Sequence, residues 1–263
     1  MHGSPAFRRL CRLGFLSLIL PSLLLEGQAA TASTDTFPSS EKLQYAIEWR
    51  LVEAGRATIT LDPVLSSTDP QWHSTVELAS AGLVSKLFKV HDKYSASYED
   101  HFCATSSLLD AIEGHRHRET QVTFDRTTNK AVYLERDLIK NTVVKRDQID
   151  VPPCVNDVIS ALYRLRMMHL DVGQSTQLPV SDGKKSVSAR VEAQEREEIK
   201  TKIGTYKTVR YEAFLFDGVL YKRRARLFVW LSDDPRRLPV QIRVRMQFTI
   251  GTITLQLDKE EHS

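Results

Sequence analysis

The sequence has few of the residue patterns that carry recognisable chemistry. It contains three cysteines, eight histidines and eleven glycines in 263 residues. It has no G-x-S-x-G elbow and no glycine-rich phosphate loop, which are the marks of α/β-hydrolases and of nucleotide-binding loops. Only one long apolar stretch occurs, near the start, so no other segment reaches the roughly twenty residues of a membrane span. These absences favour a binding or structural role over catalysis, and they indicate no cofactor.

The start of the chain has the composition of a secretory signal peptide. Three arginines precede an apolar stretch at 13–25, and a small-x-small cleavage pattern follows at 30–32. The apolar stretch is shorter than a bilayer-spanning helix, which is the alternative interpretation. We therefore expect residues 1–32 to be a cleaved signal peptide and residues 33–42 to be a disordered polar tail. The expected location is the bacterial periplasm or the exterior of the cell.

Removal of the signal peptide changes what the charge and the cysteines imply. The full chain has a net charge of +3, and loss of three arginines and one glutamate leaves about +1. This balance gives no reason to expect a nucleic-acid partner. Two cysteines remain, Cys103 and Cys154, and an oxidising compartment favours a disulfide between them. The alternative is that Cys154 is a nucleophile, because it precedes a predicted helix and a helix start lowers the pKa of a thiol.

Alternation of apolar and polar residues dominates the rest of the chain. Residues 43–49 and 57–61 predict an antiparallel hairpin with its turn at 53–55. Further alternating segments occur at 72–78, 90–98, 121–125, 131–135, 142–149, 227–231, 240–246 and 253–257. Many short strands joined by turns are typical of antiparallel folds. We expect a single mainly β domain at 43–258, built as one curved antiparallel sheet, a sandwich or a half-open barrel.

Two segments depart from this alternation. Residues 80–88 predict one short helix or helical turn. After Pro152 and Pro153, apolar residues from 155 to 169 recur at helical spacing, with basic residues toward the end. This pattern predicts one central helix that packs its apolar face on the sheet.

Three segments resemble those of domain-of-unknown-function family 3108, a set of exported bacterial proteins. They are LQYAIEW at 43–49 with AGRA at 54–57, PPCVNDVISALYRLR at 152–166, and VWLSDD at 229–234 with LPV at 238–240. The resemblance covers nearly the whole mature chain in the right order. It implies a β-rich fold and an envelope location. It brings no established activity and no catalytic residues.

Two groups of residues carry weak chemical signals. Asp233 and Asp234 could serve as an acid pair or hold a divalent metal, but an Asp before proline commonly caps its own turn. His115 and His117 are two apart and would share one face of a strand, where they could bind a metal with His101 or His91. The alternative is a solvated strand, because arginines alternate with them.

Six large apolar side chains are candidates for the lining of a ligand cavity, and their alternative role is core packing. They are Trp49, Trp72, Leu83, Phe88, Tyr94 and Trp230. Leu83 and Phe88 belong to the short helical segment, which could act as the mouth or lid of the cavity.

The sequence thus favours an exported envelope protein that binds or assembles rather than catalyses, with an apolar or lipid-like ligand. One alternative is an interaction protein that pairs through an edge strand with another envelope protein. The other is an envelope hydrolase. The mature chain has no expected transmembrane segment, and the oligomeric state stays open.

Overall fold

The computed structural model describes residues 40–64, 71–247 and 251–262. The expected signal peptide and most of the expected tail lie outside these residues. The first half contains β1 (Glu41–Trp49), β2 (Val52–Pro63), β3 (Trp72–Ser80), α1 (Gly82–Leu87), β4 (Val90–Glu99), a 3₁₀ turn (Asp100–Phe102), β5 (Cys103–Glu113), β6 (Arg116–Asp125), β7 (Lys130–Asp137) and β8 (Thr142–Asp150). The second half contains α2 (Val158–Arg166), β9 (Ser175–Ser181), β10 (Ser186–Thr201), β11 (Gly204–Ala213), β12 (Ala225–Ser232), β13 (Pro239–Met246) and β14 (Thr252–His262).

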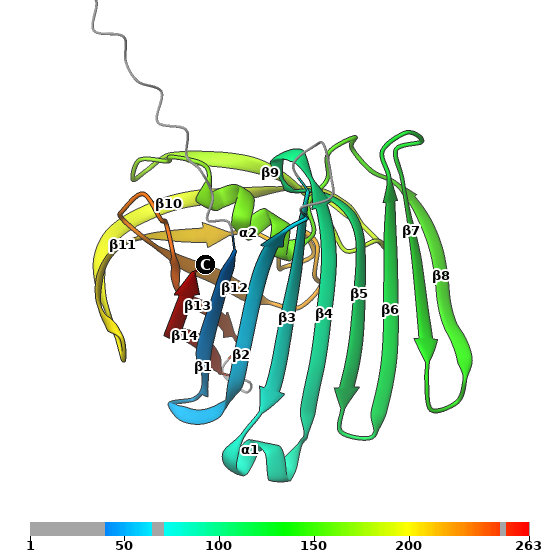
Figure 1. The fold of residues 1–263 in the computed structure, drawn as a ribbon, viewed down its shortest axis with the longest axis horizontal. Coiled ribbons are helices and arrows are strands. Elements are labelled where there is room, and N and C mark those ends of the chain that lie inside the picture. Colours follow the sequence, from blue (N-terminus) through cyan, green and yellow to red (C-terminus); the bar gives the residue numbers. More distant parts are fainter. Residues whose placement is uncertain (1–39, 65–70, 248–250, 263) are drawn as a thin grey trace, which may run out of the picture. The chain divides into compact units, whose positions relative to one another are not determined.

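All fourteen of these strands belong to one antiparallel sheet that does not close on itself (Figure 1). Its order is β8-β7-β6-β5-β4-β3-β2-β1-β14-β13-β12-β11-β10-β9. The first and last strands pair at the centre, while β8 and β9, which flank α2 in the sequence, form the two edges. In Figure 1, β1–β8 stand side by side and the long β10 and β11 arch over one end. The expectation of a mainly β fold with one antiparallel sheet is confirmed.

The central hairpin shows why the alternating residues form strands. Leu43, Tyr45 and Ile47 on β1 are buried and face Ile59, Ala57 and Gly55 on β2. The intervening polar residues lie on the other face, because successive side chains of a strand point in opposite directions. This pattern buries one apolar row along each strand.

The turn of this hairpin lies at Arg50 and Leu51, not at 53–55. Both residues have positive φ values, 51° and 68°. A two-residue hairpin turn needs positive φ at both positions if it is to match the twist of the strands. Gly55 lies inside β2, where a Cβ atom would come within 2.3 Å of the Ala79 carbonyl oxygen. This glycine therefore permits a close approach of β2 and β3 instead of forming a turn.

The central helix is shorter than predicted. α2 begins at Val158, after the N-cap Asp157, and ends at Arg166. The preceding Val155 and Asn156 are extended, because the Asn156 amide donates to the Pro179 carbonyl of β9 and its carbonyl accepts from Ser181. Val155 therefore lies in an extended segment that pairs like a strand, although its spacing fits the helical pattern.

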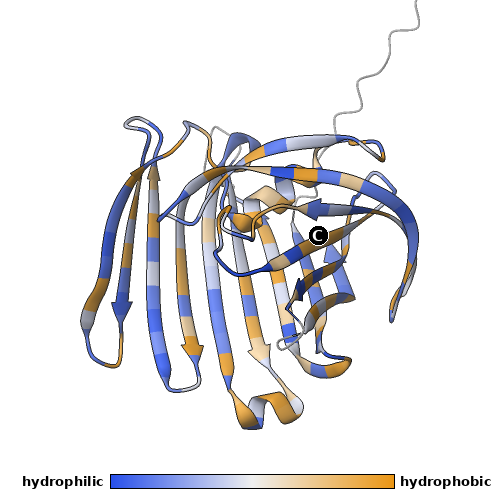
Figure 2. Cartoon of the chain, turned by 180° about the vertical axis from the view of Figure 1, so that it is seen from behind, coloured by the Kyte–Doolittle hydropathy of each residue, from blue (hydrophilic) through white to orange (hydrophobic). Residues whose placement is uncertain are grey.

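Two apolar clusters lie on either side of α2. One is formed by inward side chains of β1–β7, β13 and β14 with Tyr163 of α2, and the other by β9–β12 with Ala161 and Leu165 of α2. The helix thus joins the two parts of the core. Its predicted packing against the sheet is observed (Figure 2).

Candidate ligand-binding site

A cavity of about 410 Å³ lies between one face of the sheet and the start of α2. Strands β3–β7 supply one wall, and α2 with the β9–β10 turn supplies the other. Its lining residues are Val76, Tyr94, Ser107, Leu109, Thr120, Val122, Phe124, Tyr133, Asp157, Val158, Ile159, Ser181, Asp182, Lys184 and Tyr221. The lining is mainly apolar with a small number of polar groups, as is usual for small-molecule sites.

The β9–β10 turn fixes one side of the cavity. Gly183 has a φ of 82°, a conformation that favours glycine. A Cβ atom at this position would lie 2.7 Å from a methyl carbon of Val122 and 3.2 Å from the ring of Tyr133. The ammonium group of Lys184 lies 4.9 Å from the centre of the Tyr133 ring. These contacts hold the turn against β6 and β7, although the two parts are far apart in sequence.

Asp157 places a buried carboxyl group in this cavity. Its side chain caps α2, since Oδ1 accepts a hydrogen bond of 2.7 Å from the Ser160 amide. The residue is only 4% exposed, and Oδ2 accepts no hydrogen bond of ordinary geometry from the described residues. Burial raises the pKa of Asp157, and the Ser160 amide partly opposes that rise. Buried polar atoms are normally hydrogen-bonded, so this carboxyl is an unusual polar group for a mainly apolar lining.

Tyrosine hydroxyls surround the Asp157 carboxyl. The Tyr98 hydroxyl lies 3.5 Å from Oδ1 and 2.7 Å from the hydroxyl of Ser74. Burial raises the pKa of Tyr94 and Tyr98 well above the usual range, and the Asp157 charge adds to this rise. These hydroxyls therefore stay protonated. The cavity combines neutral hydroxyls with the carboxyls of Asp157 and Asp182 and the ammonium group of Lys184, and it contains no histidine among its described lining residues.

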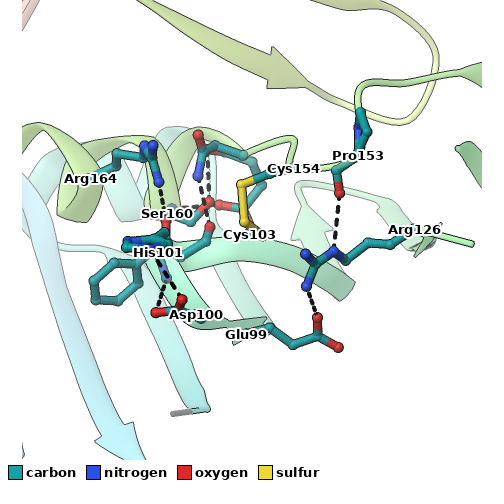
Figure 3. Close-up of a disulfide and its surroundings, with 12 residues drawn as sticks. Glu99, Asp100, His101, Cys103, Arg126, Pro153, Cys154, Ser160 and Arg164 are labelled. Atoms are coloured by element: carbon teal, nitrogen blue, oxygen red, sulfur yellow. Dashed lines mark hydrogen bonds and ion pairs between the residues drawn. A yellow bond between two sulfur atoms is a disulfide. The ribbon is translucent and has the colours of Figure 1, made fainter. Parts of the chain in front are cut away.

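A disulfide anchors the chain just before Asp157 (Figure 3). Cys103 and Cys154 are bonded, with their Cα atoms 4.9 Å apart. Beside the bond, the buried Asn156 donates from Nδ2 to the Phe102 carbonyl at 2.7 Å, and Ala104 donates to the Val155 carbonyl. This short segment thus ties β5 to β9 and fixes the position of the N-terminus of α2.

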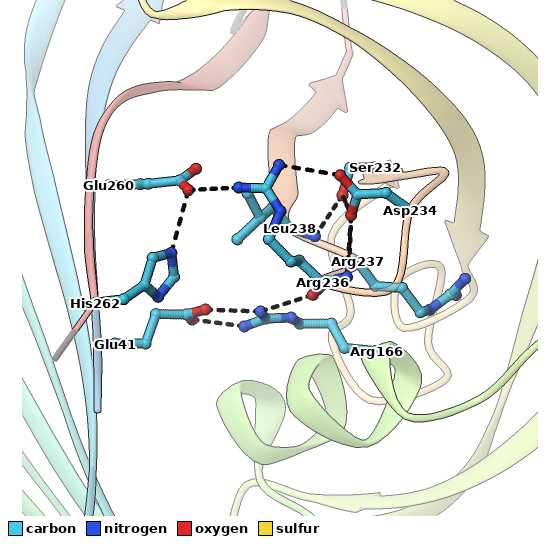
Figure 4. A network of polar contacts seen from close by, with 9 residues as sticks. All are labelled: Glu41, Arg166, Ser232, Asp234, Arg236, Arg237, Leu238, Glu260 and His262. Atoms are coloured by element: carbon cyan, nitrogen blue, oxygen red, sulfur yellow. Dashed lines mark hydrogen bonds and ion pairs between the residues drawn. The ribbon is translucent and has the colours of Figure 1, made fainter. Parts of the chain in front are cut away.

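A buried ion pair anchors the other end of α2 (Figure 4). Arg166 donates two hydrogen bonds, of 2.6 and 2.7 Å, to the carboxylate of Glu41, and a third of 3.1 Å to the Arg236 carbonyl. The side chains of Arg166 and Glu41 are 2% and 0% exposed. Glu41 belongs to the segment expected to be a disordered tail, so that expectation is wrong for its last residues, which begin β1.

Comparisons with known proteins agree with this architecture. The profile of the family described as "Protein of unknown function (DUF3108)" matches residues 44–258. The chain belongs to this family. No curated protein matches the sequence of this DUF3108 member.

Solved structures resemble the DUF3108 fold at low sequence identity. A β-barrel-like DUF1849 protein from Brucella abortus has a TM-score of 0.57 at 8% identity, over 86% of this chain and 99% of that one. A candidate lipoprotein from Parabacteroides distasonis has a TM-score of 0.33 at 7% identity, over 86% and 97% of the two chains. The first likeness supports the fold, and the second is too weak to support an argument.

The six side chains predicted to line a cavity are not brought together. Only Tyr94 lines the cavity of the DUF3108 chain. Trp72 stacks on Phe102, and Trp230 is buried beside Phe228 and donates to Glu197. The other three lie at one end of the sheet with considerable exposure, namely Trp49 at 36%, Leu83 at 67% and Phe88 at 52%.

The acid pair occupies a turn. Asp234 accepts hydrogen bonds from the Ser232 hydroxyl and from the amides of Arg236 and Arg237, while Asp233 pairs with Arg196 at 3.0 Å. The interactions with Ser232 and Arg236 lower the pKa of Asp234 despite burial, which opposes them. This geometry favours the turn-capping interpretation of the sequence over acid–base chemistry.

The two candidate metal-binding histidines do not face a common site. His115 lies in the β5–β6 turn, and His117 contacts Asp110 at 2.6 Å. Within the described residues, no group of three or more His, Cys, Asp or Glu side chains could hold a metal ion. No helix in this part of the chain is long and apolar enough to cross a bilayer.

A larger hollow of about 940 Å³ lies against β13 and β14, on the side away from the apolar clusters. Its lining includes Gln241, Arg243, Arg245 and Thr254.

Sequence reasoning missed Asp157 and Lys184 as cavity residues. Asp157 has a recognisable signal, since an Asp after an extended segment and before an apolar helix predicts an N-cap. The burial of its carboxyl depends on the inner face of β4 and β5, which the local sequence does not indicate.

Proposed function

We propose that this DUF3108 protein is an exported, non-enzymatic binding protein that holds a small amphiphile in the cavity between β3–β7 and α2. The ligand has an apolar body and a head group that donates a hydrogen bond. The observation that carries the proposal is the buried Asp157 carboxyl among the residues that line the cavity, whose Oδ2 accepts no hydrogen bond of ordinary geometry from the described residues.

The size and lining of the cavity support a small ligand. Its volume of about 410 Å³ lies within the usual range of roughly 300–1,000 Å³ for ligand pockets. Leu109, Val122 and Phe124 offer apolar surface to the body of the ligand, and burial of that surface supplies the main driving force. The polar groups gather near the start of α2 and would orient the head.

Asp157 selects the head group as a hydrogen-bond acceptor. A hydroxyl, amide or amine is a donor that fits beside its carboxyl oxygens. A carboxylate head would place two like charges together in a site of low polarity, which is costly unless they share a proton. An alcohol is therefore a better ligand than a fatty acid of the same length.

The anchored walls support a site that exists before the ligand arrives. The Cys103–Cys154 bond fixes the start of α2, and the Glu41–Arg166 pair fixes its end. A preformed pocket loses less conformational entropy on binding than a flexible one.

Export is part of the proposal and rests on the sequence of residues 1–32. The disulfide is consistent with it, because such bonds persist in oxidising compartments outside the cytoplasm. N-terminal sequencing of the protein from its native host tests this part. A mature protein that retains the apolar stretch at 13–25 would contradict it.

The binding proposal is tested by calorimetric titration with 1-decanol and decanoate at pH 8. We expect the wild type to bind 1-decanol and to bind decanoate more weakly. Asp157→Asn should weaken 1-decanol binding at least about tenfold, because a hydrogen bond to a buried charged group contributes roughly 1.5–3 kcal/mol. Asparagine is an N-cap as good as aspartate, so the helix should persist.

Two results would contradict the proposal. One is equal affinity of the wild type for decanol, decanoate and decane, which would leave Asp157 without a role. The other is that the wild type binds none of these three compounds. Thermal unfolding of Asp157→Asn serves as the control for folding.

A second candidate function is pairing through the edge strand β8. Its nine residues form one end of the sheet, and Val143 and Val144 on it are 58% and 46% exposed. Lys145, Arg146 and Asp150 also lie on β8, and such charges discourage unwanted strand addition. Dimer formation or capture of a peptide that Val143→Pro abolishes would support this function.

A further inference from the structure

We propose that one end of the sheet docks on a lipid bilayer with an anionic surface. The structural basis is a row of exposed apolar and basic side chains on the connections that lie at this end. We call this row the tip surface, and its apolar members are Leu51, Val52, Leu83, Leu87, Phe88, Leu138 and Ile139. This inference is independent of the proposed ligand cavity.

Strand topology places these residues together. Because β1–β8 pair in order and are antiparallel, the β1–β2, β3–β4, β5–β6 and β7–β8 connections all lie at one end. Figure 1 shows α1 and the neighbouring turns along this end, and Figure 2 shows α1 as mostly apolar. The β3–β4 and β5–β6 connections are in contact, since Gly114 lies against the Phe88 ring.

The degree of exposure is unusual for such large apolar residues. Leu51 is 93% exposed, Leu87 84%, Leu83 67% and Ile139 65%. Contiguous apolar patches on soluble proteins commonly mark an interaction surface. These side chains come from three separate connections at the same end, and large exposed apolar side chains on turns suit insertion between lipid head groups.

Basic residues accompany the apolar ones. Lys86, Lys89 and Lys140 are exposed, and none of them forms an ion pair within the described part of the chain. Two of the acids at this end are already engaged, because Glu53 pairs with Arg56 and Asp137 caps the turn at Ile139 and pairs with Arg118. A further acid, Glu113, is exposed and adjoins His115 and Arg116.

The opposite end of the same strands has a different character. Its described connections are the polar turn at 125–129 and the 3₁₀ turn at 100–102, and neither contains an exposed large apolar residue. Among the described connections, apolar side chains flanked by lysines therefore occur only at the end that carries the tip surface. Such an arrangement binds membranes through apolar insertion and attraction to anionic head groups.

Co-sedimentation with vesicles tests the inference. We expect the full mature protein to bind phosphatidylcholine vesicles that contain phosphatidylglycerol, and to bind pure phosphatidylcholine weakly. Lys86→Glu with Lys89→Glu should reduce binding about thirtyfold or more, because each basic residue near an anionic surface contributes about 1 kcal/mol. The matched control is Lys222→Glu with Arg224→Glu, which makes the same change in net charge at exposed positions elsewhere.

The apolar contribution is tested with a second matched pair. Leu87→Glu should reduce vesicle binding at least about tenfold, whereas Val132→Glu on β7, away from the tip surface, should leave binding unchanged. Both side chains are already exposed, so neither substitution removes a core contact. Circular dichroism confirms the fold of each variant. The inference is overturned if the wild type does not bind the anionic vesicles, or if each test variant and its control lose binding equally. Decanol titration of the same variants separates this outcome from failure of the cavity proposal.

Discussion

The buried Glu41–Arg166 pair allows a quantitative prediction about stability. Arg166→Met keeps an aliphatic side chain of similar length but removes all three hydrogen bonds of the guanidinium group that Figure 4 shows. The Glu41 carboxylate, which is 0% exposed, then lacks its cation. Removal of one partner from a buried ion pair costs about 3–5 kcal/mol. We therefore expect Arg166→Met to lower the free energy of unfolding by about 4 kcal/mol.

Urea denaturation followed by circular dichroism measures this loss. The control is Arg136→Met, which breaks a surface pair with Glu119 in which the arginine is 49% exposed. Exposed pairs contribute about 0–1 kcal/mol, so the control should lose less than about 1 kcal/mol.

A double variant separates the ion pair from simple packing. Glu41→Gln with Arg166→Met removes the uncompensated charge, so it should be more stable than Arg166→Met alone by about 1–3 kcal/mol. The reasoning is refuted if Arg166→Met loses no more stability than Arg136→Met, or if the double variant loses the sum of the two single losses.

Three further predictions follow from the same structure. Cys154→Ser should lower the free energy of unfolding by about 2–5 kcal/mol, as reduction of the wild type with dithiothreitol should also do, because the bond closes a loop with a sequence separation of 51. Burial, with the nearby Glu113 charge, raises the pKa of Asp92 from 3.8 to about 6. Folding therefore takes up a proton between these two pH values, and the charged form of Asp92 destabilises the folded protein. Asp92→Asn should therefore stabilise the protein above about pH 6, with the gain vanishing near pH 4 in urea titrations across pH. Gly183→Ala should lower the melting temperature and weaken decanol binding, because the new methyl group meets Val122 in a strained backbone position.

Local patterns in the sequence predicted much of the sheet. The buried rows of β1 and β2 follow directly from period-two alternation. The expectation of export to an oxidising compartment led to the predicted pairing of Cys103 with Cys154, and the structure contains this disulfide.

The predictions from sequence were wrong at residues whose role depends on a contact with a segment far away in the sequence. Gly55 was read as a turn residue, but it accommodates the backbone of β3. Glu41 was assigned to a polar tail, although its partner Arg166 lies 125 residues away. The central pairing of β1 with β14 likewise joins the two ends of the described chain and leaves no local signal.

The candidate cavity was harder to predict than the fold. Aromatic residues were chosen by type, but most of them pack in the core or lie at the tip surface. The cavity forms where the inner faces of five strands meet α2 and the β9–β10 turn. This arrangement depends on the curvature of the sheet, which the alternation of apolar and polar residues does not specify.

Native mass spectrometry of the protein purified from its own cell envelope tests the central claim most directly. Leu109 lines the cavity, whereas Leu108 lies on the other face of β5 and is 39% exposed, so tryptophan at either position makes a matched pair. The account predicts a co-purified small amphiphile on the wild type and on Leu108→Trp, and its loss from Leu109→Trp, where the larger ring fills the cavity. A ligand that remains bound to Leu109→Trp, or a wild-type protein that carries none and binds no decanol, would contradict it.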